Sequence, residues 1–241
     1  AKQVSSAIYQ FSANFQSAFN PQIVKAYASG ENEYLFGLIN RTSLFSFYLL
    51  FIFAFPILLC SDFILELWLE NVPEYTVGLC VLLIIGQLIT ALASPLWMVA
   101  FATGDIKEYQ IVLCSLNLLI LPASYVVLRF GYSVYYVLIF QIFLKVLIYI
   151  YRLWFIRRKL GFPILKYIMS VILKCAGLAV LIIPIPVILS IRASGLWQNL
   201  AVMALSMLIS IVVFFFLGLN KETQEMIFNF IRNKLQMLKS S

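Results

Sequence analysis

The sequence predicts an all-α, polytopic membrane protein with about seven transmembrane helices. Of its 241 residues, 63% are hydrophobic and only 11% are charged, and the mean hydropathy is +0.99. Soluble domains are about half apolar and about a quarter charged. Long stretches carry no charge, and roughly 20 apolar residues in a helix cross a bilayer core about 30 Å thick. These continuous runs differ from the short alternating strands of a membrane β-barrel.

The first expected helix runs from Lys2 to Lys25 and has two different faces. Its polar residues repeat at steps of three and four and share one side: Gln3, Ser6, Gln10, Asn14 and Ser17. Apolar residues take roughly the opposite side: Ile8, Phe11, Phe15 and Phe19. The polar face suits either a wet cavity or contact with neighbouring helices. Asn20-Pro21 is expected to bend or end this helix, because proline removes a backbone donor.

Six further spans follow, each helical because lipid offers no partner to an open sheet edge. They cover about 42–61, 75–104, 109–128, 132–151, 164–190 and 197–219. A polar connection from Gly30 to Glu33 precedes the first of these six. Pro95 is expected to kink the run within 75–104.

Basic residues gather on one side of the membrane when seven spans are threaded. Twelve of the 17 Lys and Arg residues fall on the side of the tail, at positions 25, 41, 107, 152, 157, 158, 159, 166, 221, 232, 234 and 239. The other side holds Lys2, Arg129 and Arg192, with the acids Asp62, Glu66, Glu70 and Glu74. Loops rich in Lys and Arg stay in the cytoplasm, so the tail is expected inside. The net charge of +7 then follows from topology and anionic lipid, and no nucleic-acid partner is expected.

The last segment, 220–241, has the pattern of an amphipathic helix that lies on the cytoplasmic membrane surface. Apolar residues share one face: Ile227, Phe228, Ile231, Leu235 and Leu238. Polar residues share the other: Glu222, Glu225, Asn229, Arg232 and Gln236. Burial of the apolar face and attraction of basic residues to lipid headgroups hold such a helix in place.

Histidine is absent from the sequence, which excludes His-based acid–base catalysis and most zinc or iron sites. The cysteines at 60, 80, 114 and 175 lie in or beside apolar runs without a CxxC spacing. They are expected to be small buried hydrophobes rather than disulfides or metal ligands. No catalytic residue, metal or cofactor is expected. A chain that begins with Ala1 in a membrane-like segment is expected to be a fragment of a longer protein.

Two lysines, Lys145 and Lys174, lie inside expected spans. A Lys at a helix centre costs about 2.5–3.5 kcal/mol on insertion scales, so each needs a reason. Snorkelling toward the cytoplasmic headgroups is one interpretation, and helix packing is another. The third is a cationic lane for an anionic group such as a pyrophosphate, formed by polar stripes on consecutive helices. The two stripes are Gln141, Lys145, Tyr149 and Arg152, and Lys166, Ser170 and Lys174.

One passage of the chain carries a family resemblance. It reads Asn14-Phe15-Gln16-Ser17-Ala18-Phe19-Asn20-Pro21-Gln22-Ile23-Val24-Lys25-Ala26-Tyr27-Ala28-Ser29-Gly30-Glu31. This passage resembles the helix-to-loop segment of bacterial polysaccharide flippases of the Wzx type. Later features are similar too: a span that opens with Arg41, an acidic outer loop, Pro95-Leu96 in a long uncharged span, and Ala102-Thr103-Gly104-Asp105 before the next helix.

The resemblance implies the MATE-like fold of the MOP superfamily, with two six-helix lobes around a central cavity and two extra C-terminal helices. The seven expected spans then correspond to helices eight to fourteen of fourteen. Residues 1–157 would form second-lobe helices, 158–219 the two extra helices, and 220–241 the cytoplasmic tail helix. The first helix would line the cavity, and Lys174 would lie on an extra helix outside the lobes.

The resemblance also implies a function, which is translocation of lipid-linked oligosaccharide across the bacterial inner membrane by alternating access. The expected partners are an oligosaccharide on undecaprenyl pyrophosphate, membrane lipids and a missing N-terminal half of the same protein. Basic cavity residues bind the pyrophosphate in that family, and Lys145 is the counterpart here. The candidate substrate-binding residues are Gln10, Asn14, Ser17, Lys25, Gln141, Lys145, Tyr149, Arg152 and Lys174.

Other functions remain open at this point. A MATE-type exporter of drugs or other solutes has the same fold, although no Asp or Glu lies deep in a span to bind a coupling proton or Na⁺. A polysaccharide polymerase or acyltransferase usually has a large outer loop or an intramembrane His, whereas the expected outer loops here are short. A purely structural membrane subunit is the last alternative.

Overall fold

The computed structural model describes residues 2–68, 73–193, 195–221 and 224–225, and this part of the chain is helical without a β-strand. Its α-helices are α1 (Lys2–Ala28), α2 (Asn32–Leu59), α3 (Ser61–Trp68), α4 (Thr76–Ala102), α5 (Ile106–Leu118), α6 (Ile120–Arg129), α7 (Tyr135–Leu160), α8 (Ile164–Tyr167), α9 (Leu173–Ile182), α10 (Pro184–Arg192) and α11 (Leu196–Val213). Two π-helical turns complete the set: η1 (Ile168–Ile172) joins α8 to α9, and η2 (Phe214–Gly218) follows α11.

Six helical segments of the described residues are long and apolar enough to cross a membrane. They are Asn32–Leu59, Thr76–Ala102, Ile106–Arg129, Tyr135–Leu160, Ile164–Arg192 and Leu196–Gly218. This finding agrees with the predicted all-α, polytopic membrane protein. The first of the seven expected spans is also a helix, α1, but it does not belong to this group. Its polar residues lower its hydropathy, so the structure supports six spans by composition and not the expected seven.

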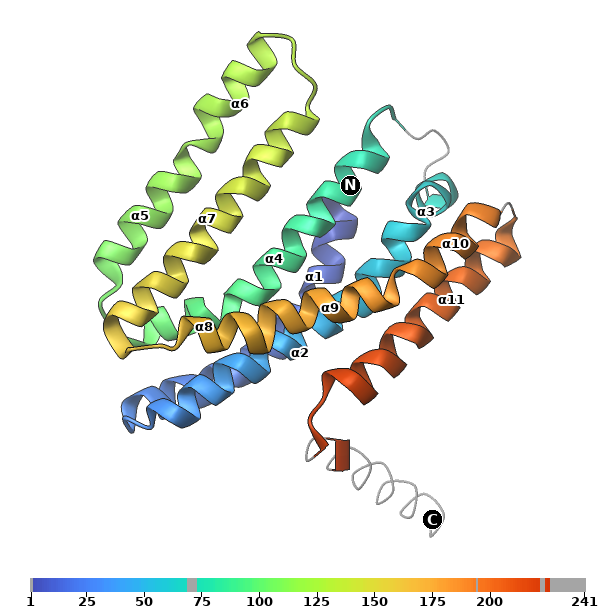
Figure 1. Ribbon diagram of the computed structural model, residues 1–241. Helices are drawn as coiled ribbons and strands as arrows, with labels where there is room; N and C mark the ends of the chain where they lie inside the picture. Colours follow the sequence, from blue (N-terminus) through green and yellow to red (C-terminus); the bar gives the residue numbers. More distant parts are fainter. Residues whose placement is uncertain (1, 69–72, 194, 222–223, 226–241) are drawn as a thin grey trace, which may run out of the picture.

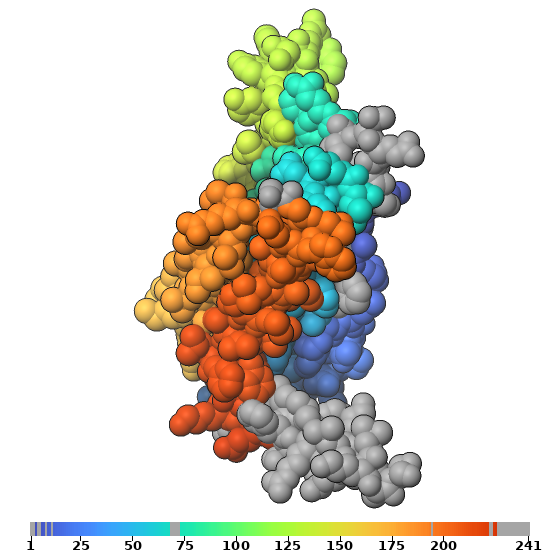
Figure 2. Space-filling model, turned by 90° about the vertical axis from the view of Figure 1, so that its right-hand side faces the viewer, coloured from blue at the N-terminus to red at the C-terminus, as the bar shows by residue number. Residues whose placement is uncertain are grey.

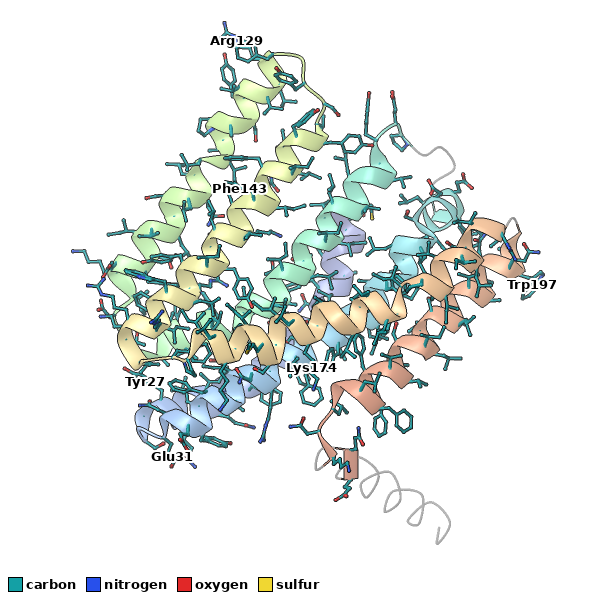
Figure 3. The ribbon with its side chains drawn as sticks, in the orientation of Figure 1. Tyr27, Glu31, Arg129, Phe143, Lys174 and Trp197 are labelled. Atoms are coloured by element: carbon teal, nitrogen blue, oxygen red, sulfur yellow. The ribbon has the colours of Figure 1, made fainter. Side chains whose placement is uncertain are left out.

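The turns of the bundle gather at two ends (Figure 1). The α1–α2, α4–α5 and α7–α8 turns lie together at one end, which we call the basic end. The α6–α7 turn, α3 and the α10–α11 turn lie toward the opposite end. Figure 3 labels Glu31 at the basic end, and Arg129 and Trp197 away from it. The helices therefore alternate in direction in the order that threading from the sequence requires.

Two ion pairs hold the basic end together. Arg158 of α7 pairs with Glu108 of α5 at 3.1 Å, and Lys159 pairs with Asp105 in the α4–α5 turn. All four side chains are at least one-third exposed, so each pair is worth little by itself, about 0–1 kcal/mol. Their effect is to fix the end of α7 against the α4–α5 turn.

α1 and α2 form a tight helical hairpin. α1 continues through Pro21 to Ala28 instead of ending at the proline, because Ile23 and Ala26 beyond it are buried at 0% and 3% exposure. Gly30 makes the turn with a φ of +72°, which glycine adopts without steric cost. α2 then begins at Asn32, ten residues before the expected start of the second span at 42.

Proline explains why the expected span 109–128 is two helices in line, α5 and α6, with a break at Leu119. Pro122 lies in the first turn of α6, where a missing N–H is tolerated best. Ile183 marks a similar interruption between α9 and α10. Its φ of −62° and ψ of −43° stay helical, but Pro184 and Pro186 have no N–H to donate to the carbonyls four residues before them. α5 and α6 keep one direction across their break, whereas the span bends between α9 and α10 (Figure 1).

α7 is longer than the expected span 132–151. It ends at Leu160, where Gly161 caps it in the left-handed conformation with a φ of +70°. Arg152 therefore lies inside the helix instead of at its close. The expected domain boundary between 157 and 158 also falls within α7, and the chain turns at Gly161.

The last spans pack on α2 from the side that Figure 2 faces, where α9, α10 and α11 cover the flank. Tyr48 of α2 stacks on Phe214 with ring centroids 4.3 Å apart. A Cβ on Gly218 would lie 3.0 Å from the Tyr48 ring, so glycine permits this close approach. Gln224 caps the end of η2, since its Nε2 lies 2.8–3.2 Å from three backbone carbonyls. The amphipathic helix expected at 220–241 lies almost entirely outside the described residues.

Candidate binding groove

α4 occupies the centre of the bundle, in contact with α1, α2 and α7. Pro95 interrupts the backbone hydrogen bonds of this helix. Proline has no N–H, so the Ala91 carbonyl four residues earlier has no partner within the helix. Gln16 of α1 supplies one, because its Nε2 donates to Ala91 O at 3.1 Å. Gln16 is only 2% exposed. The bond thus satisfies two buried polar groups at once.

The carbonyl of the next residue, Leu92 O, contacts a buried cluster of hydroxyl groups. The Tyr167 hydroxyl of α8 lies 2.8 Å from Tyr149 OH of α7, 3.1 Å from Ser43 Oγ of α2 and 3.3 Å from Leu92 O. All three hydroxyl-bearing side chains are buried. We call Ser43, Tyr149 and Tyr167 the tyrosine cluster. It joins α2, α4, α7 and α8 through mutually satisfied polar groups.

The third carbonyl, Ala93 O, accepts a hydrogen bond from Arg152 Nη1 of α7 at 3.0 Å. The Arg152 Nε is buried and has no partner among the described residues. Arg152 and Thr90 line two cavities on neighbouring sides of α4. We call the two cavities together the α4 groove. The anchored guanidinium lies at their junction.

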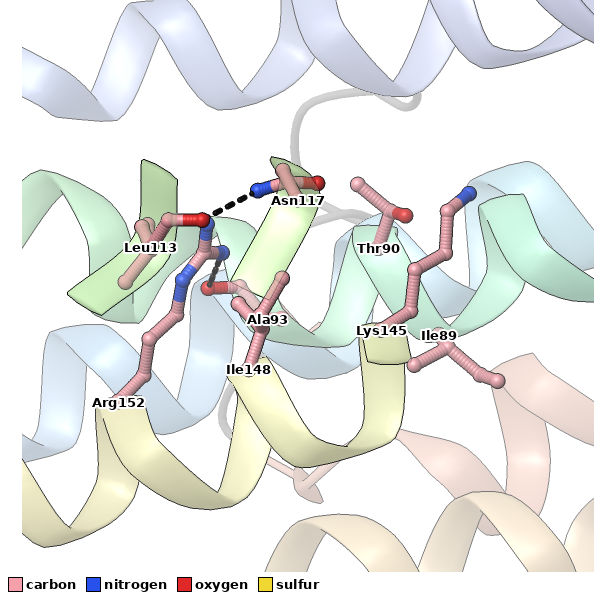
Figure 4. Close-up of a pocket in the computed structure, with 8 residues that line it drawn as sticks. All are labelled: Ile89, Thr90, Ala93, Leu113, Asn117, Lys145, Ile148 and Arg152. Carbon is pink, nitrogen blue, oxygen red and sulfur yellow. Dashed lines mark hydrogen bonds between the residues drawn. The ribbon is translucent and has the colours of Figure 1, made fainter. Parts of the chain in front are cut away.

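The first cavity has a volume of about 190 Å³ and lies between α4, α5 and α7. It is lined by Ile89, Thr90, Ala93, Leu113, Asn117, Lys145, Ile148 and Arg152. Figure 4 shows Lys145 and Arg152 reaching into it from the same side of α7. Seven residues separate them, which is close to two helical turns.

Lys145 extends across Gly86 of α4. A Cβ at Gly86 would lie 3.0 Å from Lys145 Nζ, so the absence of a side chain makes room for the ammonium group. Among the described residues, no Asp or Glu lines either cavity. The two cations of the groove are therefore free of acidic partners within it.

The second cavity is larger, about 500 Å³, and lies between α1 and α4. It is lined by Tyr9, Ala13, Gln16, Ser17, Asn20, Thr90, Ser94, Trp97, Met98 and Arg152. Tyr9 OH lies 3.1 Å from Ser94 Oγ, which fixes the tyrosine ring at the edge of the cavity. Trp97 is 37% exposed. This part of the groove is aromatic and amide-rich with Arg152 as its one charged lining residue, whereas the first is lined by both Lys145 and Arg152.

The polar face expected on α1 is only partly in the groove. Ser17 lines the second cavity. Gln10 and Asn14 are exposed and hydrogen-bond to each other at 3.1 Å, outside both cavities. Lys25 is exposed near the basic end and lines neither cavity. The buried amide of α1 is Gln16, on a side of the helix that the expected polar face did not include.

The polar stripe expected on α7 divides in two. Lys145 and Arg152 share the first cavity, as the stripe predicts. Tyr149 belongs to the tyrosine cluster and lines neither cavity, and Gln141 is half-buried outside both. At about 100° per residue, Tyr149 projects about 60° away from Arg152. This rotation turns its hydroxyl toward α8.

The stripe expected on the next span does not join these cations. Lys166, Ser170 and Lys174 line neither cavity of the α4 groove. Figure 3 places Lys174 on α9 near its crossing with α2. The reason is that η1 and α9 lie against α2, and α9 also against α11, instead of along the groove side of α7. The expected two-stripe lane is thus reduced to the stripe on α7.

Sequence reasoning missed most of the groove lining on α4. Thr90, Ser94 and Trp97 recur at steps of four and three, which is the signal of a shared helical face. The run 75–104 has no charged residue, so it is interpreted as uniformly apolar and the shared face of these three residues is not recognised. Asn117 is the one Asn of the expected span 109–128, and it too lines the groove. Polar residues within apolar spans were the sequence feature that could have indicated this groove.

Comparisons with known proteins give the chain no relative. No protein-family model, curated protein or solved structure matches it. The function is therefore argued from the groove and from the sequence pattern.

Proposed function

We propose that the chain is part of a flippase for lipid-linked oligosaccharide in the bacterial inner membrane. It would move sugars on undecaprenyl pyrophosphate to the outer leaflet by alternating access. The single observation that carries this proposal is the pair Lys145 and Arg152 in one groove of membrane helices, where no described acidic residue lines the groove. The resemblance of the 14–31 passage to Wzx-type flippases supports the same function.

Lys145 lies deep inside α7, fifteen positions before the last residue of the helix, Leu160. α7 continues past Arg152, so the exposed basic cluster begins at Arg157. Twelve residues separate Lys145 from Arg157, or about 18 Å at the helical rise. This distance is longer than one Lys side chain, which disfavours snorkelling. An intramembrane Lys that faces a cavity is a feature of a substrate or ion path.

The lining of the groove is cationic. Two cations without a carboxylate favour an anionic ligand, and a pyrophosphate carries several oxygens that accept from a guanidinium and an ammonium together. A cation-coupled exporter of cationic drugs would need an acidic residue at the site. The groove lining gives that alternative no support.

α1 packs within the helical bundle. We propose that it is a seventh span, because it packs along α2 and α4 and turns at the basic end like its neighbours. Its side chains contribute half of the second cavity. With α1 as a span, the basic end faces the cytoplasm under the positive-inside rule. The C-terminus is then cytoplasmic.

Complementation tests this proposal. The full-length gene that encodes the chain is expressed in a flippase-deficient strain whose surface polysaccharide is absent. We expect surface polysaccharide to return, with no change in resistance to cationic drugs. Drug resistance without polysaccharide would instead identify a solute exporter.

A further inference from the structure

The two cavities of the α4 groove differ in chemistry, and this difference identifies what each would hold. The first cavity contains Lys145, and the second is lined by aromatic, amide and hydroxyl side chains. Arg152 and Thr90 belong to both. A ligand that spans the groove would meet Lys145 and Arg152 at one side, and mainly neutral groups beside Arg152 at the other.

We infer that the second cavity is a sugar subsite, in which Trp97 stacks on a pyranose ring and the α1 amides bind its hydroxyls. This inference rests on the proposed function, because it divides one lipid-linked oligosaccharide between two cavities. The volume of about 500 Å³ falls within the range of about 300–1,000 Å³ that small-molecule sites have.

Trp97 has the position that stacking requires. Its ring is 37% exposed and borders the cavity. Phe101 supports it from the next turn of α4, with ring centroids 4.5 Å apart. A pyranose presents a face of C–H groups, which packs against the electron-rich face of an indole. Tyr9 adds a second aromatic group, held by its hydroxyl at 3.1 Å from Ser94 Oγ.

The polar lining matches the other requirement of a sugar, which is paired donors and acceptors. Asn20 is exposed, and its amide makes no hydrogen bond among the described residues. Gln16 uses its Nε2 for Ala91 O, so its Oε1 is the atom available to accept from a hydroxyl. Ser17 donates to Asn14 O at 2.7 Å and keeps acceptor capacity. Neutral amides and hydroxyls recognise sugar hydroxyls without a charge.

Calorimetric titration of the purified full-length protein in detergent tests the inference. The probes are the free oligosaccharide, released by mild acid from the lipid-linked oligosaccharide of the source cells, and inorganic pyrophosphate. Trp97→Leu is expected to weaken oligosaccharide binding about tenfold, equivalent to 1.4 kcal/mol, and Trp97→Phe much less. Pyrophosphate binding should persist in Trp97→Leu, which also shows that this variant is folded.

Two matched variants complete the design. Trp154→Leu removes a Trp that is 47% exposed on α7 and lines neither cavity, and it should leave oligosaccharide binding unchanged. Lys145→Met should weaken pyrophosphate binding and spare the oligosaccharide.

The outcomes separate this inference from the proposed function. Equal oligosaccharide affinity in the wild type and Trp97→Leu would overturn the sugar subsite, and so would pyrophosphate binding without oligosaccharide binding. If the wild type bound neither probe, the proposed function would fail and the subsite with it.

Discussion

Lys145 and Arg152 are seven positions apart on α7, which brings both side chains to one face, whereas Tyr149 turns toward α8. The sequence predicted the shared position of the two cations from their spacing alone. The sequence could not predict where the Tyr149 side chain lies. Residues at steps of three and four cover a helical face that is broad enough to contact two neighbouring helices. Which neighbour receives each side chain depends on how α7 and α8 pack.

Tyr167→Phe should destabilise the protein. Tyr167 is fully buried, and its hydroxyl contacts Tyr149, Ser43 and the Leu92 carbonyl. Its loss leaves the buried Tyr149 hydroxyl without its partner, while Ser43 Oγ still donates to the Leu92 carbonyl at 3.2 Å; one unsatisfied buried group costs about 1–3 kcal/mol. Thermal unfolding in detergent measures the effect. The control is Tyr136→Phe, since Tyr136 is 56% exposed; equal unfolding midpoints for both variants would contradict the cluster's structural role.

Gly78→Ala should also destabilise the protein, by overpacking. A Cβ at Gly78 would lie 2.6 Å from the outer edge of the Tyr135 ring of α7. That ring also packs on Tyr75, with ring centroids 5.5 Å apart, so its displacement is expected to cost about 1 kcal/mol, the low end of the range for overpacking. Gly37→Ala is the matched control, because nothing lies within 4 Å of a Cβ there and alanine favours a helix. The unfolding midpoint should fall for the first variant and stay or rise for the second. A Gly78 variant as stable as the wild type would show that α4 and α7 are not packed this closely.

At the scale of elements, apolar length predicted the six long membrane helices, because a bilayer requires them. Their ends were less predictable. α2 begins ten residues early and α7 ends nine residues late relative to the expected spans, because charged and polar residues at a membrane surface do not end a helix. Glycine turns bound these helices instead: Gly30 lies just before α2, and Gly161 lies just after α7.

The Ala91 carbonyl, which has no partner within α4, gives a prediction about how α1 and α4 pack. Gln16→Leu should cost about 1–3 kcal/mol of stability, because it leaves Ala91 O buried without a partner. In a Pro95→Ala background the new N–H can bond Ala91 O within the helix, so the same change should cost less. A double-mutant cycle on unfolding free energy measures the difference, expected at about 1 kcal/mol. An unchanged cost in both backgrounds would show that Gln16 does not compensate for the proline.

The whole molecule presents a basic end and an opposite end, and the proposed orientation follows from them. Single cysteines report it in a variant that lacks the four native cysteines at 60, 80, 114 and 175. Ser133→Cys, in the α6–α7 turn, should react with a membrane-impermeant maleimide in intact cells. Ser29→Cys, in the α1–α2 turn, should react only after permeabilisation.

Ser6→Cys, near the start of α1, decides whether this helix is the seventh span. If α1 crosses the membrane, this residue lies on the side of Ser133 and reacts in intact cells. If Ser6→Cys reacts only after permeabilisation, as Ser29→Cys does, both ends of α1 lie on one side of the membrane. The chain would then have six spans, and the second cavity would not be part of a transmembrane path.

The most direct test of the proposed function is translocation of lipid-linked oligosaccharide in proteoliposomes that contain the full-length protein. Lys145→Met and Lys174→Met remove the two lysines that the sequence places inside spans, one in the α4 groove and one outside it. A hydrogen bond to a charged group is worth about 1.5–3 kcal/mol. We therefore expect the first variant to slow translocation about tenfold or more, and the second to retain the wild-type rate. Equal rates for both variants, or no translocation by the wild type, would contradict the assignment of the α4 groove as the binding site of a lipid-linked oligosaccharide flippase.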